Sequence, residues 1–284
     1  MKLSSLFTAL GLAATLGIAS VAQAADKPEI KIGYVNGWAD SVATSETAAA
    51  IIREKLHYPV KLVAVSAGIM WSGVARGDLD TSLSAWLPVT HAQYYKKFKK
   101  DVVLEGIVEK DAKIGLVVPD YVKAKTVADL KKYKANYNGV ITGIDAGAGV
   151  MDKAQKAIKA YDLGFTLAAS SGAGMAVALD RAIRAKKPIV VTGWQPHWMF
   201  GRYKLRFLSD PKKVFGESEN VYAMINPKLE KKAPEVVAFL KKFQWKPGQI
   251  AKVMVDIKDG TKPSDAAKKW VAANEAEVNG WVGK

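Results

Sequence analysis

The sequence predicts an α/β fold with mostly parallel sheets, and three observations support this prediction. Short runs of Ile and Val alternate along the chain with longer segments whose apolar residues recur at helical spacing. Gly and Pro punctuate these segments, as at Gly77 after a helical pattern and Pro88 after a strand pattern. The 284 residues include no Cys, so disulfides and thiolate metal sites are excluded. Strands that alternate with helices favour a sheet covered by helices.

The first 24 residues predict a signal peptide. A positive start at Met1-Lys2 precedes an apolar run over residues 6–22, and Ala22-Gln23-Ala24 fits the small-x-small cleavage pattern. The run is short for a membrane span. No Cys follows it, which excludes a lipid-modified N-terminus. We therefore expect a mature chain that begins at Ala25 and works in the periplasm, and that meets the membrane only through a partner.

The predicted elements follow one another in a regular order. Strand patterns occur at residues 30–35, 60–65, 81–85, 113–119, 140–144, 188–192 and 221–225. Helical patterns occur at residues 41–57, 69–76, 88–97, 151–161, 173–186, 233–243 and 247–258, with a last helix through Trp270. Pro88 suits the first turn of its helix.

The chain is long enough for two lobes of ordinary domain size. We expect two strands to cross between the lobes, near residues 112–115 and 216–221. The first lobe then holds residues 25–114 and 221–284, and the second holds residues 115–220. No internal repeat or low-complexity linker interrupts either lobe.

The chain is basic, with 42 Lys and Arg against 27 Asp and Glu and a net charge of +15. A basic balance can indicate nucleic-acid binding. Here the Lys residues come mostly in pairs at predicted helix surfaces and turns, such as Lys96-Lys97 and Lys241-Lys242. That placement is typical of solvated faces, so we expect no nucleic-acid partner.

Three of the eight Trp residues follow predicted strands. Trp38, Trp86 and Trp194 each stand just beyond a strand's carboxyl end, where open α/β sheets bind ligands. One such Trp alone would more often pack in a core or form a platform for a sugar. Three converging rings favour a box for a quaternary ammonium group, held at about 2 kcal/mol per desolvated ring.

A second pattern indicates an anion site. Residues 145–150, Asp-Ala-Gly-Ala-Gly-Val, lie between a predicted strand and the helix that follows. Free backbone N–H groups at a helix start bind anions, and Gly allows close approach. Gly149 and Val150 are the candidate donors, and His91 can reach the same carboxylate from the other lobe. His197 is a possible supporting residue of the wall, although a structural role fits it better.

Several segments resemble the glycine betaine/proline betaine substrate-binding proteins of ABC importers, over nearly the whole mature chain. They are Gly-Tyr-Val-Asn-Gly-Trp at 33–38, Ser-Ala-Trp-Leu-Pro-Val-Thr-His at 84–91, Lys-Ile-Gly-Leu-Val-Val-Pro at 113–119, Gly-Ile-Asp-Ala-Gly-Ala-Gly at 143–149, Val-Thr-Gly-Trp-Gln-Pro-His-Trp-Met-Phe at 191–200 and Leu-Ser-Asp-Pro at 208–211.

The resemblance implies a two-lobed clamshell of the type II periplasmic-binding-protein class, with mixed, mostly parallel sheets. It assigns the trimethylammonium cage to Trp38, Trp86 and Trp194. It assigns the carboxylate to His91, Gly149 and Val150. It also implies a monomer that delivers glycine betaine to the permease of an ABC importer, without cofactor or metal.

Two departures from the family pattern concern the exact ligand. Gly37 is inserted before Trp38, and Ser84 stands where the family commonly has Asp. Asp40 lies two residues after Trp38, an arrangement that choline-binding relatives place near the ammonium or hydroxyl group. Choline, carnitine, proline betaine and sulfonium betaines therefore remain alternatives to glycine betaine.

An α/β hydrolase-like enzyme is the distant alternative. The chain has no Cys nucleophile, no Gly-x-Ser-x-Gly elbow and no His-Glu-x-x-His zinc motif. The segment Ser170-Ser171-Gly172 could resemble an active serine, but it also fits an ordinary loop before a helix. We therefore predict a binding protein with no catalytic residues.

Overall fold

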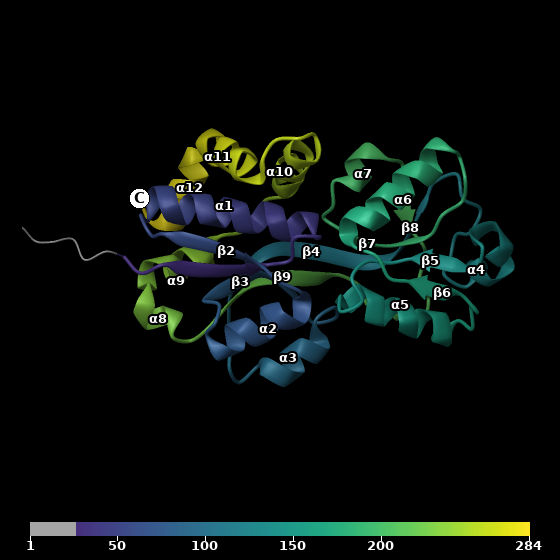
Figure 1. The fold of residues 1–284 in the computed structure, drawn as a ribbon, viewed down its shortest axis with the longest axis horizontal. Coiled ribbons are helices and arrows are strands. Elements are labelled where there is room, and N and C mark those ends of the chain that lie inside the picture. The colour runs from purple at the N-terminus through teal and green to yellow at the C-terminus, as the bar shows by residue number, and fades with distance from the viewer. Residues whose placement is uncertain (1–26) are drawn as a thin grey trace, which may run out of the picture.

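A computed structural model describes residues 27–284, and it has two halves side by side along its longest axis (Figure 1). The predicted signal peptide, residues 1–24, lies outside the described residues. No helix within residues 27–284 is long and apolar enough to span a membrane.

Nine strands form the described sheet, in the order β2-β1-β3-β9-β4-β7-β5-β6, with β8 paired to β4. The strands are β1 Ile30–Tyr34, β2 Val60–Ala64, β3 Thr81–Leu87, β4 Val103–Pro119, β5 Val140–Thr142, β6 Thr166–Ala168, β7 Val191–Gln195, β8 Leu205–Phe207 and β9 Glu219–Ile225. Four strand pairs are parallel and four are antiparallel. The sheet is therefore mixed, as predicted, but parallel pairs do not predominate, because β4 and β9 run against their neighbours.

Helices cover both faces of each half (Figure 1). They are α1 Ala39–Lys55, α2 Ala67–Arg76, α3 Ala92–Phe98, α4 Asp129–Lys132, α5 Gly149–Ala160, α6 Gly172–Arg184, α7 Met199–Arg202, α8 Leu229–Lys232, α9 Pro234–Lys242, α10 Gln249–Lys258, α11 Pro263–Ala273 and α12 Glu275–Val282. In the first half, α1, α10 and α11 lie on one side of the strands, and α2 and α3 lie on the other. In the second half, α6 and α7 lie opposite α5.

Local sequence explains several helix ends. Gly77 ends α2 in the left-handed conformation, at φ 85°, and its N–H bonds the carbonyls of Gly73 and Val74. Pro234 and Pro263 begin α9 and α11, where a missing N–H costs nothing. Pro88 does not begin a helix as predicted: residues 88–91 form a turn, and α3 starts at Ala92.

Strand β4 joins the two halves. Residues 103–112 pair with β9, whereas residues 113–119 pair with β7 and β8. The change of partner falls inside the first predicted crossing, residues 112–115. The second predicted crossing, residues 216–221, spans the turn before β9 and the start of that strand.

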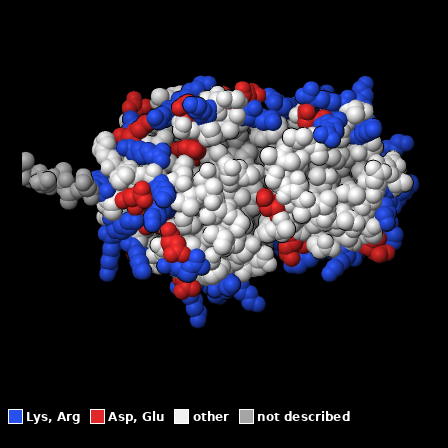
Figure 2. Space-filling view, viewed as in Figure 1, with Lys and Arg blue, Asp and Glu red and all other residues white. Residues whose placement is uncertain are grey.

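On the face of Figure 2, Lys and Arg lie around the edges and alternate with Asp and Glu. The middle of this face carries few charges. The positive charge on this face is therefore scattered rather than gathered into a stripe of the kind that follows a nucleic-acid backbone.

Candidate ligand-binding site

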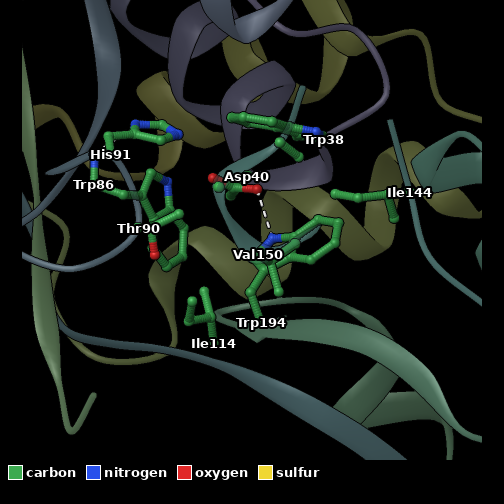
Figure 3. A pocket seen from close by; sticks show the side chains of 11 residues that line it. Trp38, Asp40, Trp86, Thr90, His91, Ile114, Ile144, Val150 and Trp194 are labelled. Atoms are coloured by element: carbon green, nitrogen blue, oxygen red, sulfur yellow. Dashed lines mark hydrogen bonds between the residues drawn. The ribbon is translucent and has the colours of Figure 1, made fainter. Parts of the chain in front are cut away.

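A cavity with an empty volume of about 300 Å³ lies where the two halves meet (Figure 3). The lining is mostly aromatic and aliphatic, with a few polar groups. The residues that line the cavity are Trp38, Asp40, Trp86, Thr90, His91, Ile114, Ile144, Ala148, Gly149, Val150 and Trp194.

The three predicted Trp residues all line this cavity and are almost fully buried. Trp38 immediately precedes α1, beyond the end of β1, as predicted. Trp86 and Trp194 lie inside β3 and β7, so their predicted place beyond the strand ends is wrong. Each strand extends further toward its carboxyl end than the local sequence indicates, because Trp86 pairs with Val221 of β9 and Trp194 pairs with Ile114 of β4.

The three Trp rings of the cavity do not pack on one another, and Trp38 instead stacks on the ring of His91, with centroids 5.8 Å apart. Among the described residues, no ring pair joins Trp38, Trp86 and Trp194 to one another. Their faces are therefore separated by space that a ligand can fill. A cation in that space would be attracted by the ring quadrupoles and would have left water behind.

The N-terminus of α5 forms one polar end of the cavity. Gly149 and Val150 are the first residues of this 12-residue helix, so their N–H groups have no intrahelical acceptor. A Cβ built on Gly149 would lie 2.1 Å from the carbonyl oxygen of Thr90. Only Gly allows this approach, which brings the helix end of one half against the loop of the other.

His91 lines the same cavity and is fully buried. Its Nδ1 accepts the backbone N–H of Trp86 at 3.2 Å, and its Nε2 has no hydrogen-bond partner. Burial lowers the pKa of His91 to about 3, so the ring is neutral and carries its proton on Nε2. A buried donor without an acceptor is costly, and a ligand oxygen would remove that cost.

Asp40 links the two halves beside the Trp rings. It lies in the first turn of α1, and its Oδ1 accepts the indole N–H of Trp194 at 2.7 Å (Figure 3). Burial raises the pKa of Asp40 to about 6, although the bond from Trp194 opposes the shift. Burial, together with the charge of Asp40, raises the pKa of Glu109 on β4 to about 8. Of these two carboxyl groups, Asp40 lines the cavity, and a cation bound there would stabilise its ionised form.

His197 does not line this cavity. It lines a neighbouring groove, and its ring meets the edge of Trp194 with centroids 4.7 Å apart. Its Nδ1 accepts the N–H of Met199 at 3.2 Å. His197 therefore packs behind Trp194, in agreement with the structural role predicted for it.

Sequence reasoning missed four lining residues, namely Thr90, Ile114, Ile144 and Ala148. Thr90 directly precedes His91, and this position next to a predicted site residue was the signal in the sequence that could have identified it. Ile114 and Ile144 follow ordinary strand patterns and carry no signal in the sequence. Ser171 caps α6 by accepting the N–H of Gly174, which is the ordinary loop role.

Comparisons with known proteins give the chain its family. The profile of the substrate-binding domain of ABC-type glycine betaine transport systems matches residues 28–273. The glycine betaine/carnitine transport binding protein GbuC of Listeria monocytogenes serotype 1/2a is 39% identical over 190 residues, which are 66% of this chain and 61% of GbuC. The matched segment thus spans less than two thirds of that relative.

Two solved proteins share the fold along nearly the whole chain. Lactococcal OpuAC, closed and complexed with glycine betaine, has a TM-score of 0.85 and 40% identity, covering 90% of this chain and 100% of its own. An ABC-transporter choline binding protein at 26% identity scores 0.84 with choline bound, covering 90% of this chain and 91% of its own. It scores 0.79 in an unliganded semi-closed form, covering 90% and 92%.

The matched family is one of substrate-binding domains and not of enzymes. Its fold is the α/β periplasmic-binding-protein fold with a mixed sheet, as in OpuAC. The profile covers far more than half of the 284 residues. This chain belongs to the family of substrate-binding domains of ABC-type glycine betaine transport systems.

Proposed function

We propose that this chain captures glycine betaine between its halves and delivers it to the permease of an ABC importer. The proposal depends on one observation: three Trp rings that do not pack on one another line a cavity whose lining also includes the unpaired Nε2 of His91 and the first residues of α5. Glycine betaine has a permanent cation at one end and a carboxylate about one methylene away. GbuC, which the chain resembles, is a glycine betaine/carnitine transport binding protein, and OpuAC is closed in complex with glycine betaine.

In the proposed complex, Trp38, Trp86 and Trp194 cage the trimethylammonium group. The carboxylate accepts hydrogen bonds from the N–H groups of Gly149 and Val150 and from Nε2 of His91. Asp40 adds a negative charge near the cation and fixes the ring of Trp194. Permanent charge and hydrogen-bond geometry thereby select the two ends of the ligand separately.

We further propose that residues 25–114 and 221–284 form one lobe and residues 115–220 the other, and that they close on the ligand. Contacts across the halves support a closed form. They include Asp40 with Trp194, the Tyr94 hydroxyl with the Gly147 carbonyl at 2.8 Å, and Arg202 with Asp259. A Cβ on Gly172 would lie 1.9 Å from the Gly37 carbonyl, so the inserted Gly37 closes against a residue that must be Gly. The higher TM-score to the choline-bound form than to the semi-closed form agrees with closure.

Choline is the second candidate ligand, and Asp40 is the observation that favours it. A buried carboxylate can bond a ligand hydroxyl or face a cation, and choline offers both. The unpaired Nε2 of His91 and the amides of α5 would then lack a carboxylate to bind. This mismatch places choline after glycine betaine.

Calorimetric titration of the mature chain tests the proposal. We expect glycine betaine to bind more tightly than choline, carnitine or a sulfonium betaine. Small-angle scattering should show a smaller radius of gyration in saturating betaine, because ligand shifts the population toward the closed form. Tight choline binding without betaine binding would overturn the ligand assignment, and unchanged scattering would overturn closure.

A further inference from the structure

A buried carboxylate, that of Glu219, holds the loop from which His91 reaches the cavity. Glu219 is the first residue of β9 and is 4% exposed. Its Oε2 accepts the backbone N–H groups of Val89 and Thr90 at 3.1 and 2.9 Å. Its Oε1 accepts the hydroxyl of Thr90. Three donors from two adjacent loop residues thus meet one side chain about 130 positions away in the sequence.

The same loop is held from a second direction. Gly216, in the left-handed region at φ 73°, packs against the side chain of Val89, and a Cβ there would lie 2.7 Å from Val89 Cγ2. Residues 216–219 therefore enclose the turn formed by residues 88–91. Three hydrogen bonds to a carboxylate hold the turn more rigidly than backbone packing alone would, because each bond to a charged acceptor is short and directional.

This loop is also the point at which the first half touches the helix α5. The carbonyl of Thr90 lies against Gly149, the residue whose free N–H opens the anion end of the cavity. The next residue, His91, carries the unpaired Nε2 donor. Displacing the loop would move both the histidine donor and the surface against which α5 docks.

Glu219 also belongs to the connection between the halves. It pairs with Ala112 of β4, the residue at which β4 changes partners. Burial raises the pKa of Glu219, and the hydrogen bonds from Thr90 and Val89 and the charge of Lys153 on α5 oppose this shift. Glu219 therefore pairs with the crossing strand β4 through its backbone and bonds the loop of His91 through its carboxylate.

We propose that Glu219 is a positioning residue that sets the loop of residues 88–91 so that Nε2 of His91 and the amides of α5 meet one ligand carboxylate. This inference rests on the proposed function. Glu219 does not line the cavity, so its effect on binding must pass through the loop. Its loss should therefore weaken binding of the carboxylate end of a ligand more than binding of the ammonium end.

Calorimetry of Glu219→Ala with glycine betaine and with choline tests this inference, with choline titrated to saturation. We expect affinity for glycine betaine to fall by roughly tenfold and affinity for choline by less than about threefold, since one misplaced charged hydrogen bond costs on the order of a factor of ten. Glu219→Gln should stay close to the wild-type affinity, because its carbonyl can accept both amides and its amide can donate to the Thr90 hydroxyl.

Asp80→Ala is the matched control. Asp80 is also a buried carboxylate of the first half, and it accepts the backbone N–H of Lys31 at 2.8 Å and bonds Lys232, away from the cavity. Its loss should lower the midpoint of thermal unfolding without changing the ratio of the two affinities. Thr90→Val, which removes only the hydroxyl donor, provides a milder variant if Glu219→Ala does not fold.

The outcomes separate the inference from the function on which it rests. If Glu219→Ala or Thr90→Val lowers both affinities by one factor, or neither, the positioning role is overturned while ligand capture stands. Equal losses in Glu219→Gln and Glu219→Ala would also overturn it, because acceptor geometry would not be the cause. A wild-type chain that binds neither ligand would remove the proposed function together with this inference.

Discussion

Two groups of three tryptophans have nearly equal burial but opposite surroundings. The cavity tryptophans, Trp38, Trp86 and Trp194, are 3–6% exposed, and the C-terminal tryptophans, Trp245, Trp270 and Trp281, are 3–9% exposed. Rings of the second group pack on one another: the Trp245 and Trp270 centroids are 4.8 Å apart and those of Trp270 and Trp281 are 5.9 Å apart. Rings of the first group make no such pair. The two groups therefore differ in whether their rings pack on one another, and not in burial.

Helix α1 provides one hydrogen-bond acceptor to a tryptophan of each group, and the two acceptors differ in whether they can carry a charge. Near its start, Asp40 accepts the indole N–H of Trp194 with an ionisable group. One turn later, Thr44 accepts the indole N–H of Trp245 with a neutral hydroxyl at 3.0 Å. A neutral acceptor is sufficient where the task is packing. A buried carboxylate is costly, and the cationic ligand that we propose would explain its presence.

Trp270→Ala should produce the largest effect, and it should be an effect on stability. Removing a fully packed Trp leaves a cavity that its neighbours cannot fill, at a cost of about 3–5 kcal/mol in the free energy of unfolding. Ligand affinity of the folded protein should be unchanged. Urea denaturation followed by calorimetry measures both quantities. Weaker binding with unchanged stability would remove the distinction between the two groups.

Thr44→Val should cost about 1–3 kcal/mol of unfolding free energy, because it leaves the buried N–H of Trp245 without an acceptor at nearly constant volume. The variant should bind glycine betaine as the wild type does. Thermal unfolding with and without ligand gives both values. A loss of affinity in this variant would mean that the C-terminal tryptophans also shape the cavity.

Trp86→Ala should act on binding. Loss of one desolvated ring removes about 1–2 kcal/mol of cation–π attraction, which is roughly a tenfold weaker dissociation constant. Trp86→Phe should cost less. The loss of stability should be smaller than for Trp270→Ala, since a side chain that faces a cavity has fewer packing partners to lose. Unchanged affinity here and in Trp194→Ala would refute the box.

Sequence patterns were sufficient to predict the family, the α/β class, and the three Trp residues and the start of α5 that line the cavity. They failed where distant pairing decides the structure. Trp86 and Trp194 were expected after strands but lie within them, because β9 and β4 extend those strands from afar. Strands β6 and β8, of three residues each, are too short to leave a periodic pattern. Glu219 looks like any strand-end carboxylate until folding brings the loop of Thr90 to it.

The pH dependence of ligand affinity gives the smallest and most specific difference between the cavity tryptophans and the C-terminal tryptophans. With a pKa raised to about 6 by burial, Asp40 is ionised at neutral pH and gains a proton as the pH falls through 6. A bound cation favours the ionised form, so binding lowers this pKa and releases the proton in acid. Affinity should therefore be fully present above about pH 7 and decline below pH 6, by up to about tenfold near pH 5.

Other groups near the site do not produce this profile. His91, with its pKa lowered to about 3, stays neutral throughout the range, and Glu109, with its pKa raised to about 8, is protonated below neutral pH. Asp40→Asn should bind more weakly at neutral pH and lose the decline between about pH 7 and pH 5, whereas Thr44→Val should keep it. Calorimetric titration of the three proteins in buffers of differing ionisation enthalpy measures affinity and proton release together. A decline that persists in Asp40→Asn would show that another group carries it, and the contrast between the two acceptors on α1 would then have no functional meaning.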